Sequence, residues 1–136
     1  MADIRKVTDD FSVAPQLAPA DVAVAASQGF VKLINNRPDG EVPGQPTSAQ
    51  MEQTARAAGL DYVHIPFVGR PSPAQVEAIR NEAEDADGPV LAFCRSGTRS
   101  ITAWSIGQAE AGLRSRDELL ELGAGAGYDL SAALGS

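Results

Sequence analysis

One segment, residues 90–104, constrains the fold of this chain more than any other, because it joins three local patterns in direct succession. The apolar run Val90–Phe93 follows a Gly-Pro pair and is typical of a strand that is buried on both faces of a parallel sheet. The polar turn Cys94–Ser100 comes next, and apolar residues return at helical spacing from Ile101 onward. We therefore predict a buried strand, a polar loop and a helix, with the only cysteine of the chain at the end of the strand.

Strand-like and helix-like segments alternate along the rest of the chain. We predict strands over residues 30–36 and 60–66, a short edge strand over 11–14, and helices over 17–26, 47–58, from 73 onward, 100–111, 115–122 and 130–134, with a flexible break at 123–127. This alternation predicts an α/β fold: a single domain, residues 1–136, with a central mostly parallel sheet and helices on both faces. Residues 113–136 are expected to form a helical C-terminal extension.

The turn after the predicted strand favours a thiolate that faces an anion. A helix N-terminus leaves backbone N–H groups without partners and carries partial positive charge. Gly97 permits a positive φ or the close approach of a ligand, and Arg99 offers a planar fork of donors that matches an oxyanion. We predict Cys94 as the nucleophile and Arg99 as its catalytic partner. Further anion contacts are expected from Arg95, Ser96, Gly97, Thr98 and Ser100. The simpler alternative is that Cys94 is a small buried hydrophobe that ends a strand.

Composition excludes several classes of function. One cysteine excludes an intrachain disulfide framework and a multi-cysteine zinc site, and one histidine leaves almost no nitrogen ligand set, so we expect neither metal nor cofactor. A net charge of −7 argues against a nucleic-acid partner and adds no attraction to anionic membranes. The N-terminal residues precede no apolar core of a signal peptide, and no apolar run approaches the length of a membrane span. We therefore expect a cytoplasmic protein, where a free thiol stays reduced.

The loop Cys94–Ser100 resembles the active-site loop of single-domain rhodaneses, sulfurtransferases whose cysteine carries a persulfide. It also resembles the phosphate-binding loop of protein tyrosine phosphatases, although four residues rather than five separate Cys94 from Arg99. Together with 11–17 and 33–41, it is similar to a bacterial phosphatase-like domain that is also found beside a metallo-β-lactamase-like hydrolase and is often described as a sulfurtransferase. The resemblance covers about residues 8–112 and implies a fold like that of the tyrosine and dual-specificity phosphatases, with a rhodanese-like loop.

The two chemistries differ in their need for a general acid. A phosphatase of this kind needs a carboxylic acid to protonate the leaving oxygen, normally on a neighbouring loop. The segment 67–72, where the resemblance implies that loop, contains no carboxylate. Sulfur transfer expels a good leaving group and needs only a cationic cradle lined with amides. We therefore expect first a sulfurtransferase that carries a persulfide on Cys94, and as the alternative a tyrosine or dual-specificity-type phosphatase that acts through a phosphocysteine.

Four residues outside the loop are candidates for the rim of the site or for its acid. Asp39 is a candidate acid, with a turn-forming role before Gly40 as the alternative, and His64 is a second candidate that more simply lies along the sheet. Arg37 and Arg70 are candidates for added positive charge at the mouth, although a salt bridge between Arg37 and Glu41 is equally compatible with the sequence. The substrate is expected to be a small sulfur donor or an oxyanion such as phosphate.

A third class of function stays open at this stage. The domain fits a non-catalytic module that binds an oxyanion, or one that regulates a partner such as a metallo-β-lactamase-like hydrolase. Substitution of Cys94 by serine separates the cases, because an enzyme would lose turnover whereas a binding module would keep its ligand.

Overall fold

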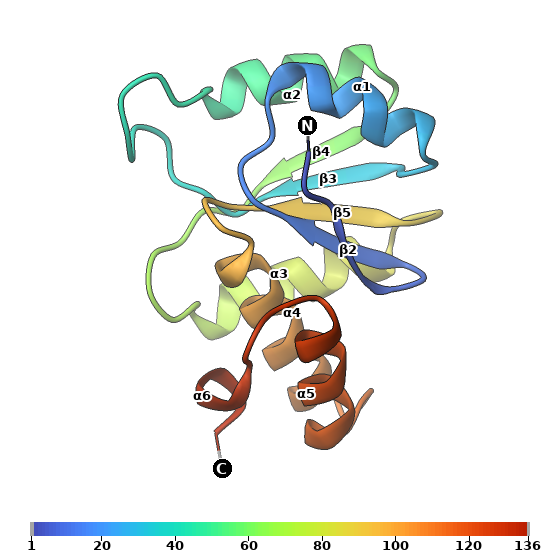
Figure 1. Ribbon diagram of the computed structural model, residues 1–136, viewed down its shortest axis with the longest axis vertical. Helices are drawn as coiled ribbons and strands as arrows, with labels where there is room; N and C mark the ends of the chain where they lie inside the picture. Colours follow the sequence, from blue (N-terminus) through green and yellow to red (C-terminus); the bar gives the residue numbers. More distant parts are fainter. Residues whose placement is uncertain (1, 136) are drawn as a thin grey trace.

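The protein is described here by a computed structural model that covers residues 2–135, with a five-stranded sheet between two groups of helices (Figure 1). The strands are β1 (Arg5–Thr8), β2 (Phe11–Ala14), β3 (Lys32–Asn35), β4 (Asp61–His64) and β5 (Val90–Phe93). The helices are α1 (Pro19–Ser27), α2 (Ser48–Ala57), α3 (Pro73–Glu84), α4 (Thr98–Glu110), α5 (Arg116–Gly125) and α6 (Ser131–Leu134). The predicted α/β class is confirmed.

The sheet has the order β1-β2-β5-β3-β4, and only the β1–β2 pair is antiparallel. The prediction of 11–14 as an edge strand is wrong: β2 pairs with both β1 and β5, and all four of its residues are buried. The strand β1, which the sequence analysis did not predict, occupies the edge instead. β1 and β2 form a short antiparallel hairpin, and β1 therefore covers the side of β2 that does not pair with β5.

The central position of β5 explains its apolar sequence. Ala92 faces a core with Ile101 and Trp104 of α4, whereas Phe93 packs on the other face with Leu17 and Met51. Figure 1 shows α1 and α2 on one side of the sheet and α3, α4, α5 and α6 on the other, so both faces are covered as predicted. A strand with helices on both faces has no side from which polar residues reach water.

Capping residues specify where three of the helices begin. The side chains of Thr47, Ser72 and Ser115 accept hydrogen bonds from the backbone N–H groups of Gln50, Gln75 and Glu118, which begins α2, α3 and α5 where the sequence indicated. The predicted flexible break at 123–127 is wrong in part, because α5 continues through Gly125. A Cβ on Gly123 would approach Leu130 Cδ1 to 2.6 Å, so a close packing contact, rather than flexibility, accounts for this glycine.

The parallel register brings the carboxyl ends of four strands to one edge of the sheet. Ala14 and Asn35 both lie beside Phe93, and Asn35 also lies beside His64. The residues that follow these strands therefore meet at the same edge, which is where open α/β sheets bind ligands.

Candidate active site

Cys94 lies at this edge, directly after β5, and its side chain is fully buried. The backbone N–H of Gly97 donates a hydrogen bond to Cys94 Sγ over 3.1 Å, and α4 begins at the next residue. Gly97 has a φ of +90°, a conformation that residues with a side chain rarely adopt. The glycine thus turns the chain so that a backbone donor points at the sulfur.

The other polar residues of the loop shape it in different ways. Ser96 and Thr98 bind one another: Ser96 Oγ donates to Thr98 Oγ1 over 3.0 Å and accepts from Thr98 N over 3.4 Å. Arg95 is exposed, and its carbonyl accepts a hydrogen bond from the backbone N–H of Gln16 over 3.3 Å. The hydroxyl of Ser100 is buried and donates to Asn36 Oδ1 over 2.8 Å, so its proton is directed at the loop after β3 rather than at Cys94.

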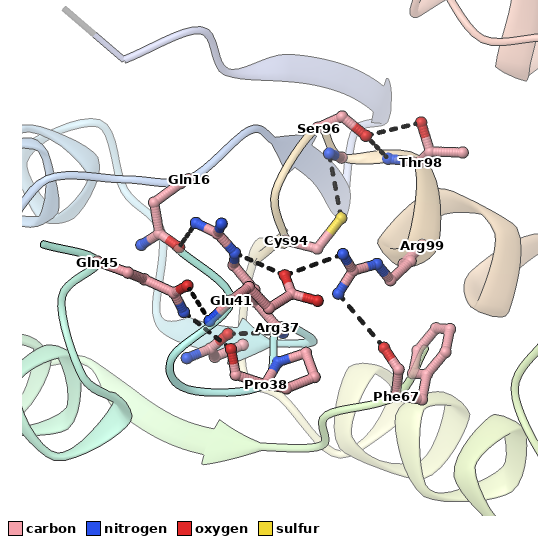
Figure 2. A network of polar contacts seen from close by, with 12 residues as sticks. Gln16, Arg37, Pro38, Glu41, Gln45, Phe67, Cys94, Ser96, Thr98 and Arg99 are labelled. Atoms are coloured by element: carbon pink, nitrogen blue, oxygen red, sulfur yellow. Dashed lines mark hydrogen bonds and ion pairs between the residues drawn. The ribbon is translucent and has the colours of Figure 1, made fainter. Parts of the chain in front are cut away.

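Arg99 belongs to the first turn of α4 and is held by two acceptors (Figure 2). Its Nη2 lies 3.0 Å from Glu41 Oε1, and its Nη1 donates to the carbonyl of Phe67 over 3.4 Å. The same oxygen of Glu41 accepts from Arg37 Nε over 2.8 Å, and Arg37 Nη1 donates to Gln16 Oε1 over 3.1 Å. One carboxylate therefore connects two guanidinium groups at the carboxyl edge of the sheet.

The electrostatics of Glu41 follow from this arrangement. The hydrogen bonds from Arg99 and Arg37, in that order, lower the pKa of Glu41, and its partial burial opposes them. Glu41 is therefore an anion at neutral pH and is not suited to donate a proton in this arrangement. Two arginines against one carboxylate leave one positive charge in this network, in contrast to the net charge of −7 of the whole chain.

The remaining predicted rim residues make different contacts. His64 Nε2 lies 2.8 Å from the carbonyl oxygen of Arg37, so it belongs to the same edge and supports the backbone there. Asp39 Oδ1 accepts from the backbone N–H of Ser48 over 2.7 Å and so binds the start of α2. Arg70 donates to the carbonyl of Ala133 in α6 over 3.3 Å, which ties it to the C-terminal helix instead of the Cys94 loop.

Three residues at the site were not among the predicted site residues. Glu41 was predicted only as a salt-bridge partner of Arg37, and Gln16 was not predicted. Tyr128 lies far along the chain, and its hydroxyl donates to the carbonyl of Ser96 over 2.8 Å. Two of the three had a sequence signal. Gln16 follows β2 at the same sheet edge, and Glu41 stands four residues after Arg37, with which it forms the salt bridge that the sequence left open. The contacts of Glu41 with Arg99 and of Tyr128 with Ser96 depend on tertiary folding.

Two features are absent from the described residues, a cluster of metal ligands and a helix that could span a membrane. Within 2–135, no group of three or more His, Cys, Asp and Glu side chains is placed to hold a metal ion. In the same range, no helix has both the length and the apolar character required to cross a membrane. The site is thus a thiol, a backbone donor and paired arginines, which together suit attack of sulfur on an electrophile that carries negatively charged oxygens.

Comparisons with known proteins identify the family to which the chain belongs. Residues 3–111 match the family model described as the phosphatase-like domain of the beta-lactamase hydrolase-like protein. A beta-lactamase hydrolase-like protein of Agrobacterium fabrum is 39% identical over 129 residues, which make up 94% of this chain but 30% of that protein. This chain therefore spans less than a third of the length of that relative.

Solved structures show the same fold. A candidate phosphatase of Neisseria meningitidis is 34% identical, with a TM-score of 0.84 over 95% of this chain and 92% of the other. The kinase associated phosphatase is 13% identical, with a TM-score of 0.76 over 98% of this chain and 89% of the other, and supports the fold alone. From the family match, which covers most of the chain, we conclude that the protein belongs to the phosphatase-like domain family of the beta-lactamase hydrolase-like proteins.

Proposed function

We propose that this protein is a cysteine-dependent phosphatase that hydrolyses phosphate monoesters, with Cys94 as the nucleophile. One observation carries the proposal: the Gly97 N–H points at Cys94 Sγ in a loop that leads directly into α4, where Arg99 occupies the first turn. Backbone donors at a helix N-terminus and a guanidinium suit the three negatively charged oxygens of a phosphoryl group. Membership of a phosphatase-like family gives independent support.

The proposed reaction has two displacements at phosphorus. The Cys94 thiolate attacks, an S–P bond forms, and the bond between phosphorus and the ester oxygen breaks with both electrons on the leaving oxygen. Water then attacks the phosphocysteine, the S–P bond breaks, and its electron pair returns to sulfur while the proton of water passes to solvent. Arg99 would neutralise the equatorial oxygens of both transition states.

The lack of a carboxylic acid in segment 67–72, together with the ionised state of Glu41, bears on the class of ester. The segment 67–72 after β4 carries no carboxylate, and the pKa of Glu41 is held low by its two arginines. A leaving oxygen that departs without a proton must be stable as an anion, which phenolates are and alkoxides are not. We therefore propose aryl phosphates as the preferred substrates over alkyl phosphates.

Sulfur transfer, the first expectation from the sequence, becomes the second candidate. The observation that favours it is the short spacing of Cys94 and Arg99 together with the missing carboxylate in 67–72. The relatives and neighbours described above are named for phosphatase or hydrolase-like proteins, and none of those names refers to sulfur transfer. We rank phosphate hydrolysis first for this reason.

A three-part assay separates the candidates. Wild-type protein and the Cys94→Ser variant are incubated with p-nitrophenyl phosphate, with an alkyl phosphate, and separately with thiosulfate followed by intact-mass measurement. Phosphate release from the aryl ester that Cys94→Ser abolishes supports the proposal, and a phosphoryl adduct on Cys94 in a quenched reaction supports the intermediate. A single sulfur adduct without phosphate release would instead establish the sulfurtransferase. Neither activity, with phosphate binding retained by Cys94→Ser, would indicate the non-catalytic module.

We also propose a partner, a metallo-β-lactamase-like hydrolase. Its support is that the matched region is 30% of a longer beta-lactamase hydrolase-like protein of Agrobacterium fabrum. Co-purification of this chain with such a hydrolase from the same organism tests it, and independent elution of the two proteins at micromolar concentration would contradict it.

A further inference from the structure

Tyr128, in the turn between α5 and α6, contacts the Cys94 loop from outside the segment that the family match covers. Its hydroxyl donates a hydrogen bond to the carbonyl of Ser96 over 2.8 Å. Its own backbone N–H donates to the carbonyl of Gly123 over 2.8 Å, which fixes the residue against the end of α5. The C-terminal extension therefore reaches the candidate active site through one side chain.

The planar peptide unit links the contact between Tyr128 and the Ser96 carbonyl to the group that faces Cys94. In a planar trans peptide, the C=O of one residue and the N–H of the next point to opposite sides. The carbonyl of Ser96 and the N–H of Gly97 form one such unit: Tyr128 holds the oxygen, and the N–H points at Cys94 Sγ over 3.1 Å. A half-turn of this peptide would direct a carbonyl oxygen at the sulfur, which would repel a thiolate or a phosphoryl group.

Glycine at position 97 makes such a rotation easier than any other residue would. It has no Cβ to restrict φ and ψ, so the sequence of the loop alone does not fix the orientation of the preceding peptide. A Cβ built on Gly97 would collide with the hydroxyl of Tyr128, which shows how closely the tyrosine covers this position. The anchor that selects one orientation therefore comes from Tyr128.

Tyr128 is itself held in place and keeps its proton. The guanidinium carbon of Arg5 lies 5.1 Å from the centre of the Tyr128 ring, and Arg5 Nη1 donates to the carbonyl of Ala126 over 3.3 Å. Burial raises the pKa of the Tyr128 phenol, the positive charge of Arg5 opposes this effect, and the negative charge of Cys94 adds to it. At neutral pH the hydroxyl is a donor, as the contact with Ser96 requires.

We propose that Tyr128 is a positioning residue of the active site: by holding the Ser96 carbonyl, it aims the Gly97 N–H at the Cys94 sulfur and so favours the thiolate and the phosphoryl-enzyme. This inference deepens the proposed phosphatase function and rests on it for the catalytic part. The part that concerns the thiolate stands on the geometry alone.

The test compares wild type with Tyr128→Phe, which removes one oxygen and keeps the ring that packs beside Arg5. The first readout is the rate at which iodoacetamide alkylates Cys94, the only cysteine of the chain, as a function of pH. We expect the rate near pH 6 to fall roughly tenfold, as loss of an oriented hydrogen bond to a charged group implies. The second readout is the pH profile of kcat/KM for p-nitrophenyl phosphate, whose acidic limb should move to higher pH.

Ser131→Ala is the matched control, because Ser131 Oγ donates to Asp129 in the same segment and is not bonded to the loop in the structure. It should leave both profiles at their wild-type positions. Arg5→Gln is a second variant that keeps the hydroxyl but removes support of the ring, and a smaller shift in the same direction is expected. If Tyr128→Phe does not fold, the alkylation and pH profiles of Arg5→Gln decide the test.

The possible outcomes are distinct. Unchanged alkylation and pH profiles in Tyr128→Phe, or in Arg5→Gln when the first variant does not fold, would overturn the inference. A shifted alkylation profile in a protein that hydrolyses no phosphate would keep the role of Tyr128 toward the thiolate while rejecting the phosphatase function.

Discussion

Glu41 acts, at the scale of single residues, on both arginines of the site. Its Oε1 accepts from Arg37 Nε over 2.8 Å and from Arg99 Nη2 over 3.0 Å, and the side chain of Arg37 is nearly fully buried. A buried guanidinium without an acceptor is costly, so the carboxylate is required for Arg37 to occupy this place. It also lowers the positive charge available to a substrate. Glu41 therefore has two opposing effects on the site: it positions the arginines, and it reduces the positive charge that they offer to a substrate.

The substitution Glu41→Gln separates these two effects. An amide keeps the shape and one acceptor but removes the negative charge, so inorganic phosphate should bind more tightly and KM for an aryl phosphate should not rise. The loss of charge-assisted hydrogen bonds leaves Arg99 poorly oriented, and we expect kcat to fall about tenfold. Steady-state kinetics with p-nitrophenyl phosphate measure both constants.

Glu52→Gln is the matched control for this experiment. Glu52 pairs with Arg56 over 3.0 Å on the exposed surface of α2, so it offers the same type of ion pair without a place in the site. Both constants should stay at their wild-type values. A Glu41→Gln enzyme with normal kcat would contradict the positioning of Arg99 by the carboxylate.

At the scale of elements, the junction of β5 and α4 depends on Gly97. We predict that Gly97→Ala lowers kcat/KM about a hundredfold, because a methyl group at a φ of +90° is strained and also collides with the Tyr128 hydroxyl that orients the loop. Gly112→Ala is the control, since Gly112 has a φ of +68° at the end of α4 but no atom within 4 Å of its Cβ position. It should cost about 1 kcal/mol of stability and no activity. Equal activities of the two variants would contradict the dependence of the loop on the Gly97 conformation and on its contact with Tyr128.

The C-terminal extension gives a second prediction at this scale. Gly123→Ala should destabilise the protein by about 1 kcal/mol although alanine favours helices, because its Cβ would meet Leu130 Cγ at 2.7 Å in a buried contact. Gly125→Ala, in the same helix but with nothing within 4 Å, should instead stabilise it by about 0.5 kcal/mol. Urea denaturation of both variants tests the pair. A stabilising Gly123→Ala would mean that α5 does not pack on Leu130.

These elements also show what the sequence could specify. The starts of α2, α3 and α5 were predicted because Thr47, Ser72 and Ser115 satisfy N–H groups within their own helices, which is a local property. The strand β1 was missed although it pairs with its neighbour β2 across a two-residue turn, because Val7 is its only buried residue and no apolar run marks the segment. The helical state of Gly123 was missed because a contact with Leu130 stabilises it, against the weak helix propensity of glycine.

The same distinction applies to the candidate site. The positions of Cys94, Gly97 and Arg99 follow from one continuous strand, turn and helix, so the sequence could place them in one loop. The sharing of Glu41 by two arginines requires the turn after β3 to approach α4, and the contact of Tyr128 requires α5 to pack beside the sheet. Neither of these contacts between distant segments produces a repeating pattern in the sequence.

At the scale of the whole molecule, acid stability should depend on the network at the sheet edge. The pKa of Glu41 is lowered in the folded protein by Arg99 and then by Arg37. A lowered folded pKa contributes stability that is fully present above the unfolded value of about 4.3 and is lost as the pH falls through the folded value. The side chain is 19% exposed, so solvent screens this contribution only in part.

The difference in unfolding free energy between wild type and Glu41→Gln should therefore depend on pH. We expect about 1–2 kcal/mol in favour of wild type near pH 7, where the carboxylate is charged in both the folded and the unfolded state. The difference should begin to shrink as the pH falls through the unfolded value of about 4.3 and should disappear once the pH has fallen through the lowered folded pKa, because protonation removes the charge that the variant lacks at every pH. Urea unfolding at a series of pH values measures it, with Glu52→Gln as the exposed control that should show little change. A difference that stays constant as the pH falls from 7 to below the unfolded pKa, until the protein unfolds in acid, would contradict an ionised Glu41 as the link between the two arginines, and with it the electrostatic arrangement on which the proposed site depends.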